Sequence, residues 1–93
     1  MVKISKYDTV DYLKSEKDIE VYLEVAFADG DPKLVARALG NVARARGMMA
    51  TAKKTKLDRA GLYRSFSKDG DPRLSTLTKV VNSLGYRLSL APA

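Results

Sequence analysis

The sequence predicts an all-α domain of five to six short helices, followed by one short C-terminal β-strand. Apolar residues recur at intervals of three and four along most of the chain, which is the period of an amphipathic helix. Glycine, proline and capping residues fall between these segments, where helices end and begin. The chain has 93 residues, the length of one domain, and we expect residues 1–93 to fold as a single unit.

Two helices are predicted in the N-terminal part. Asp8 can cap a short helix from Thr9 to about Leu13. Ser15 and Asp18 resemble a capping box, which would open a longer helix from about Glu16 to Ala28. Apolar residues of the longer helix have the spacing of a core-facing stripe; they are Ile19, Tyr22, Leu23, Ala26 and Phe27.

Val21 and Val25 lie off this stripe, on a second face of the same helix. They form either a partner-binding or dimer surface or ordinary exposed valines, and the pattern alone favours neither.

One phrase occurs twice, as residues 29–34 (DGDPKL) and 69–74 (DGDPRL). A calcium loop of the EF-hand type needs further oxygen ligands and a terminal Glu, which neither copy has. Glycine can end a helix in the left-handed conformation, aspartate can cap the next helix, and proline suits its first turn. We therefore interpret both copies as the boundaries between helices.

Each copy is followed by a helical pattern. The first helix should span Pro32 to Arg46, with Gly40 allowing the close approach of a neighbouring helix. The last should span about Leu74 to Leu84. The residues expected to face inward are Leu34, Val35, Ala38, Leu39, Val42 and Ala45 in the first, and Leu74, Leu77, Val80, Val81 and Leu84 in the last.

Between these helices, residues 48–66 read as two short helices joined by a tight turn. The first should run from Met48 to Thr55, with the small Ala52 at the crossing point. Asp58 is a natural N-cap for the second helix. Such a pair, with basic residues near the start of its second helix, is typical of the helix-turn-helix that reads the DNA major groove. An ordinary helical hairpin that binds nothing would have the same pattern.

Lys56 stands at the turn position where glycine is usual. A left-handed conformation there would cost roughly 1 kcal/mol.

The charge of the chain predicts a polyanionic partner. Lys and Arg number 17 against 11 Asp and Glu, which gives a formal net charge of +6. Nine of the basic residues lie between positions 44 and 73, as expected of a surface that contacts phosphates. We expect DNA to be bound by Arg46, Lys53, Lys54, Lys56, Arg59, Ala60, Tyr63 and Arg64. The first three would contact phosphates, and Arg59, Tyr63 and Arg64 would enter the groove.

The chain contains no cysteine and no histidine. Disulfides, thiol chemistry, zinc sites and Ser–His nucleophile pairs are therefore excluded. We expect no enzymatic activity, no metal and no cofactor. Since no apolar run approaches the length of a membrane span and the N-terminus lacks the apolar segment of a signal peptide, we expect a cytoplasmic protein.

The pattern changes after Gly85. Tyr86, Leu88 and Leu90 alternate with more polar or smaller residues, which predicts a strand over residues 86–91. A lone strand must pair with a second subunit, with the N-terminal segment or with a partner protein. We accordingly divide the domain into N-terminal helices (1–29), a DNA-binding helical core (32–85) and this strand.

The sequence resembles the helix-turn-helix antidote proteins of bacterial toxin–antitoxin (addiction) modules, related to HigA-type antitoxins, with a lambda-repressor-like core. The phrases that carry the resemblance span nearly the whole chain; they are residues 12–13 (YL), 22–24 (YLE), 38–40 (ALG), 43–48 (ARARGM), 62–63 (LY), 70–72 (GDP), 76–77 (TL) and 84–85 (LG). Lys56 and Gly61 depart from the family pattern.

The resemblance implies an antitoxin that neutralises a small toxin similar to the RelE and HigB ribonucleases, encoded beside it. It also implies repression of its own operon by a homodimer on a two-fold symmetric operator. Because the N-terminal helices have leftover apolar surface, we expect them to hold the toxin away from the DNA surface, through Tyr12, Val21, Tyr22 and Val25. The alternatives are a stand-alone transcriptional regulator without a toxin and a protein-interaction module whose basic charge is incidental.

Overall fold

The computed structural model describes residues 9–93, with side chains from residue 11 onward, so the predicted cap Asp8 lies outside the described residues. This part of the chain contains one 3-10 helix and five α-helices. They are η2 (Thr9–Tyr12), α1 (Glu16–Asp29), α2 (Pro32–Arg46), α3 (Met48–Thr55), α4 (Arg59–Ser65) and α5 (Leu74–Ser83). The prediction of an all-α class is confirmed.

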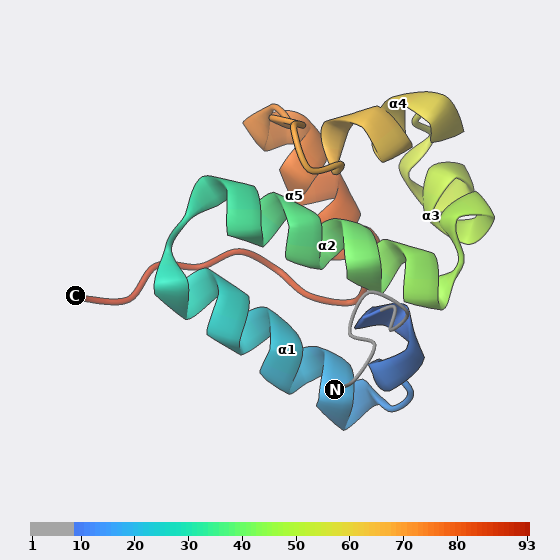
Figure 1. Ribbon diagram of the computed structural model, residues 1–93. Helices are drawn as coiled ribbons and strands as arrows, with labels where there is room; N and C mark the ends of the chain where they lie inside the picture. The colour runs from blue at the N-terminus through green and yellow to red at the C-terminus, as the bar shows by residue number, and fades with distance from the viewer. Residues whose placement is uncertain (1–8) are drawn as a thin grey trace.

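Helix α2 is the centre of the arrangement, and it contacts η2, α1, α3, α4 and α5. In Figure 1, α1 lies on one side of α2, while α3, α4 and α5 lie on the other. Helix α2 therefore connects the N-terminal helices, η2 and α1, to the predicted helix-turn-helix formed by α3 and α4.

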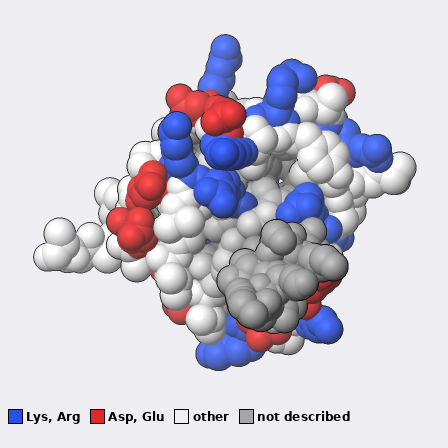
Figure 2. All heavy atoms as spheres, in the orientation of Figure 1, with Lys and Arg blue, Asp and Glu red and all other residues white. Residues whose placement is uncertain are grey.

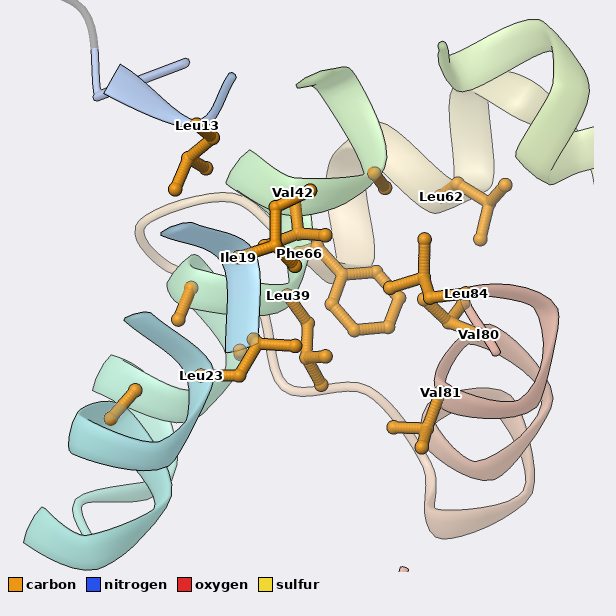
Figure 3. Packing of buried hydrophobic residues seen from close by; sticks show 14 of the residues in the cluster. Leu13, Ile19, Leu23, Leu39, Val42, Leu62, Phe66, Val80, Val81 and Leu84 are labelled. Atoms are coloured by element: carbon orange, nitrogen blue, oxygen red, sulfur yellow. The ribbon is translucent and has the colours of Figure 1, made fainter. Parts of the chain in front are cut away.

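The core forms where these two layers meet on α2. It contains Leu39 and Val42, which are 1% and 0% exposed, and Phe66, which is 5% exposed. Figure 3 shows the Phe66 ring among Leu39 and Val42 of α2 and residues of α5. An added Cβ at Gly40 would lie 2.8 Å from the Phe66 carbonyl oxygen, so the glycine lets the end of α4 approach α2 closely.

The boundary between α1 and α2 is formed as the sequence predicts. The Asp18 backbone N–H donates to Ser15 Oγ at 3.1 Å, and the Ser15 N–H donates to Asp18 Oδ2 at 3.2 Å, which completes the capping box. Gly30 ends α1 in the left-handed conformation, with φ +81°. Asp31 then caps α2 by accepting from the Lys33 N–H at 3.0 Å.

The prediction that glycine ends one helix and aspartate caps the next is wrong for the second copy of the repeated phrase, residues 69–74. Gly70 has no positive φ, and α5 begins after Arg73 without a side-chain cap. An added Cβ at Gly70 would instead collide with the carbonyl oxygens of Arg64 and Ser65. Glycine is required here because the loop folds back against the end of α4. Leu74, expected in the core, is 73% exposed.

The predicted C-terminal strand, residues 86–91, is also wrong. Residues 86–93 of the described chain form no strand, and they run from α5 back past α2 and α1 as an irregular segment, which we call the tail (Figure 1). The alternating pattern predicts an extended chain with one apolar side, but a strand also needs a hydrogen-bonding partner. The residues that the structure describes provide no such partner for residues 87–93.

Candidate nucleic-acid interface

The turn between α3 and α4 is built by Thr55, Lys56 and Asp58. Lys56 adopts the left-handed conformation, with φ 61° and ψ 28°, and ends α3. The buried Thr55 hydroxyl donates to the Thr51 carbonyl at 2.8 Å and accepts from the Leu57 N–H at 3.3 Å. These bonds hold the short connection at a fixed angle.

Helix α4 starts at Asp58, as predicted. The Gly61 backbone N–H donates to Asp58 Oδ2 at 2.9 Å, which satisfies one of the free donors of the first turn. Leu62 is 2% exposed and anchors the helix in the core together with Phe66. Since these apolar residues fix one side of α4, the opposite side faces outward.

The side chains expected to contact bases lie on this outer side. Arg59, Ala60 and Arg64 are exposed, and the Tyr63 side chain is 47% exposed. Their proximity follows from the helix itself, because residues three and four apart share a face.

Lys53 and Lys54 are exposed in the last turn of α3, and Lys56 is exposed in the turn. Most Lys and Arg side chains visible in Figure 2 lie over the half of the molecule that contains α3, α4 and the loop before α5. The structure thus brings seven of the eight predicted DNA-binding residues to the surface of one helix pair.

Arg46 is the eighth, and its guanidinium has partners within the domain. Its Nη2 lies 2.8 Å from Glu16 Oε1, and its Nη1 donates to the Leu84 carbonyl at 3.5 Å. Its Nε is buried and has no hydrogen-bond partner among the described residues. Arg46 therefore links α1, the end of α2 and the end of α5. Sequence reasoning missed this role because Glu16 lies 30 positions away.

Charge is distributed unequally along the chain. Residues 1–31 carry 8 acidic and 4 basic side chains, whereas residues 32–93 carry 3 acidic and 13 basic ones. Five of the acidic residues, Glu16, Asp18, Glu20, Glu24 and Asp29, belong to α1, and Lys17 is its only basic residue. Because α1 and α4 lie on opposite sides of α2 (Figure 1), the acidic and basic regions are separated in space.

The predicted toxin-binding residues are divided between surface and core. Tyr12, Val21 and Val25 are 58%, 45% and 64% exposed. Tyr22 is half-buried, and its hydroxyl accepts a hydrogen bond from Asn41 Nδ2 at 2.9 Å, which ties α1 to α2. The two valines thus form an exposed apolar face on an acidic helix.

Two apolar side chains are exposed where the sequence did not indicate a surface. The prediction that Phe27 faces the core is wrong, since it is 37% exposed near the end of α1, and Met49, for which no role was predicted, is 69% exposed at the start of α3. A methionine or phenylalanine at helical spacing usually lies in the core. The sequence pattern therefore does not distinguish these two exposed side chains from buried ones.

No helix in residues 9–93 has the length and apolar content needed to cross a membrane.

Comparison with known proteins gives one family. A family model described as a probable addiction module antidote protein matches residues 3–92. An uncharacterized protein of Haemophilus influenzae is 32% identical over 88 residues, which cover 95% of this chain and 91% of that protein. No solved structure gives a significant match. By the extent of both matches, the chain belongs to the family of probable addiction module antidote proteins.

Proposed function

We propose that the protein is an antitoxin that neutralises a RelE- or HigB-like toxin and represses its own operon by binding DNA as a homodimer. The family supplies the antidote role and, with it, a toxin partner in general terms. The observation that carries the finer proposal is the separation of charge: a basic helix pair on one side of α2 and an acidic helix with exposed valines on the other.

In this proposal, α4 enters the major groove. Arg59 and Arg64 form hydrogen bonds with base edges, and an arginine placed there discriminates guanine by roughly 1–3 kcal/mol. Lys53, Lys54 and Lys56 contact phosphates on the flanking backbone. Two copies bind the two halves of a symmetric operator. Arg46 links α1, α2 and the end of α5 rather than contacting DNA, because Glu16 and the Leu84 carbonyl already engage its guanidinium.

The toxin binds the opposite side of the molecule. Tyr12, Val21 and Val25 provide apolar contact area, and the surrounding carboxylates of α1 favour a basic protein. Tyr22 supports this face through its hydrogen bond with Asn41.

DNA binding is tested with the purified protein and the duplex from upstream of its own gene, against a scrambled duplex, over a series of salt concentrations. We expect tighter binding to its own duplex, and the double variant Arg59→Ala plus Arg64→Ala should abolish this preference. The matched control is Lys33→Ala plus Arg37→Ala, which removes the same charge from exposed positions of α2. Equal binding of the wild type to both duplexes would contradict repression by sequence-specific binding.

Toxin binding is tested with the purified product of the adjacent gene. Val21→Asp plus Val25→Asp should abolish the complex and leave DNA binding intact. Leu74→Asp is the control, because Leu74 is also exposed and apolar but lies on α5. A complex that survives the double substitution would show that the toxin binds elsewhere.

A further inference from the structure

A groove runs between α1 and the tail and has a volume of about 380 Å³. Its floor is formed by the buried residues Leu23, Leu39 and Val81. Phe27 on α1 and Leu88 on the tail form its two sides, and they are 37% and 38% exposed. The groove is thus an opening through which solvent reaches the edge of the core.

The end of α5 fixes the tail side of this groove. Gly85 turns the chain in a positive-φ conformation (φ +92°), and the Tyr86 N–H donates to the Val81 carbonyl at 3.1 Å. No backbone hydrogen bond joins residues 87–93 to other residues in the described part of the chain. The backbone beside the groove therefore has free donors and acceptors next to an apolar floor.

The rim of the groove differs in charge from side to side. Glu20 and Glu24 line it on α1, and Arg87 lines it on the tail. Glu20 and Tyr86 also line a neighbouring hollow that contains Glu16. The pKa of the Tyr86 hydroxyl is raised, first by burial and then by the Glu16 carboxylate. Lys17 also lines that hollow, and its Nζ lies 3.9 Å from Glu20 Oε1. With Glu20 and Glu24 against this one lysine, the α1 side keeps a net negative charge.

A second copy of the chain does not suit this groove. In a two-fold contact the same surface lies on both subunits, so a self-contact would bring Glu20 and Glu24 of both copies together with only one Arg87 from each copy, an excess of negative charge. A partner with basic side chains meets attraction at the same place. On α1, Glu24 lies between the groove and the valine face, since it is three residues from both Val21 and Phe27. One partner can therefore cover both the groove and the valine face.

We propose that this groove receives a segment of the toxin that inserts an apolar side chain between Phe27 and Leu88 and places a Lys or Arg against Glu20 and Glu24. This inference rests on the proposed antitoxin function and adds a second contact to it. The volume of about 380 Å³ takes one large side chain together with neighbouring parts of the inserted segment, and the free backbone groups of the tail hydrogen-bond with that segment.

The first test compares two leucines of the same tail. Leu88→Asp should weaken binding of the purified product of the adjacent gene at least tenfold. Leu90→Asp should change it less than twofold, because Leu90 is 101% exposed and lies outside the groove. Neither position lies in a helix or the core, and circular dichroism would verify that both variants are folded. Equal binding by both variants would overturn the proposal.

The charge of the rim is tested by Glu20→Lys plus Glu24→Lys. We expect at least a tenfold loss of toxin affinity that is steepest at low salt. The control Asp69→Lys plus Asp71→Lys makes the same change in net charge in the loop before α5, and it should retain the toxin. An equal loss in both would mean that only net charge matters and would overturn the proposed contact.

The occupant is identified by cross-linking. Since the chain has no cysteine, Ser89→Cys provides a single attachment site for a photoreactive maleimide beside the groove. Irradiation of the complex should give a product with the mass of one antitoxin plus one toxin. A product of two antitoxin chains would overturn the proposal in favour of a dimer contact. If the wild type does not bind the adjacent gene product at all, the proposed antitoxin function is wrong and the groove proposal, which rests on it, is overturned with it.

Discussion

Lys56 is the only non-glycine residue with positive φ in the described part of the chain. The conformation is required because α3 must end and the chain must turn into α4 within three residues. A side chain with a Cβ meets the following carbonyl oxygen in this region. The strain was foreseeable from the sequence, because the helix-turn-helix spacing places the turn at this position.

Replacing Lys56 by glycine should stabilise the protein by about 0.5–1 kcal/mol, because glycine adopts φ +61° without the Cβ penalty. Urea unfolding followed by circular dichroism would measure the change. Lys54→Gly is the control, since it places glycine in the regular part of α3 and should destabilise by about 1 kcal/mol. If both variants lose stability equally, the turn is not strained.

Two helical glycines should respond to alanine in opposite directions. At Gly40 a new Cβ would lie 2.8 Å from the Phe66 carbonyl oxygen, so Gly40→Ala should destabilise by about 1–3 kcal/mol. At Gly61 the nearest atom is Asp58 Oδ2 at 3.6 Å, and Gly61→Ala should stabilise by about 0.5–1 kcal/mol because alanine favours the helix. Thermal unfolding of both variants would check this pair, and a stabilised Gly40→Ala would refute the tight packing.

Single residues also mark the limit of sequence reasoning. Caps such as Ser15 and Asp58 act on neighbours three positions away, so local sequence suffices to predict them. Asp71 has the same local context as Asp31 but caps nothing, because the loop before α5 is shaped by its contact with the end of α4. A tertiary contact of this kind leaves no local pattern.

At the scale of elements, periodicity predicted the helices well. The bounds of α2 and α3 agree with the prediction, because Pro32, Gly47 and the turn at Lys56 mark their ends. The strand prediction was wrong because alternation reports only which side of an extended segment is apolar. Whether such a segment pairs depends on what lies beside it, and the tail lies beside the side chains of α1 instead of another strand.

Arg46 connects three elements, and its substitution should therefore affect folding more than that of an exposed lysine. Arg46→Ala removes the contacts with Glu16 and the Leu84 carbonyl and should lower the free energy of unfolding by about 1–2 kcal/mol. Lys53→Ala should change it by less than about 0.5 kcal/mol. Urea titration of the two variants would measure both values. An unaltered midpoint for Arg46→Ala would mean that the link contributes nothing.

At the scale of the whole molecule, the sequence predicted that positive charge gathers around α3 and α4. It did not predict that α1 lies on the far side of α2, because the direction in which α1 packs is decided by contacts such as Tyr22 with Asn41. The candidate DNA-binding residues could be listed from sequence, but the groove beside the tail could not, since its sides are about 60 residues apart in the chain.

If the protein binds DNA as proposed, the salt dependence of its affinity should report the number of phosphates that the basic region contacts. Each neutralised phosphate contributes a slope of about −0.9 to the plot of log affinity against log salt. Lys53→Ala plus Lys54→Ala should reduce the magnitude of the slope by about 1.8, as measured by fluorescence anisotropy with a labelled duplex. Lys33→Ala should leave it unchanged within about 0.3, and a similar reduction there would mean that the contacts are not confined to the helix-turn-helix.

The separation of charge on the two sides of α2 gives the protein an electric dipole roughly along the line from α1 to α4. In the field of a nearby duplex such a molecule experiences a torque before any contact forms, and it turns its positive end towards the phosphates. The side of the protein that contains α1 then points away from the duplex during the approach. A second protein bound to α1 would consequently face away from the duplex from the first encounter, and no conformational change would be needed for this.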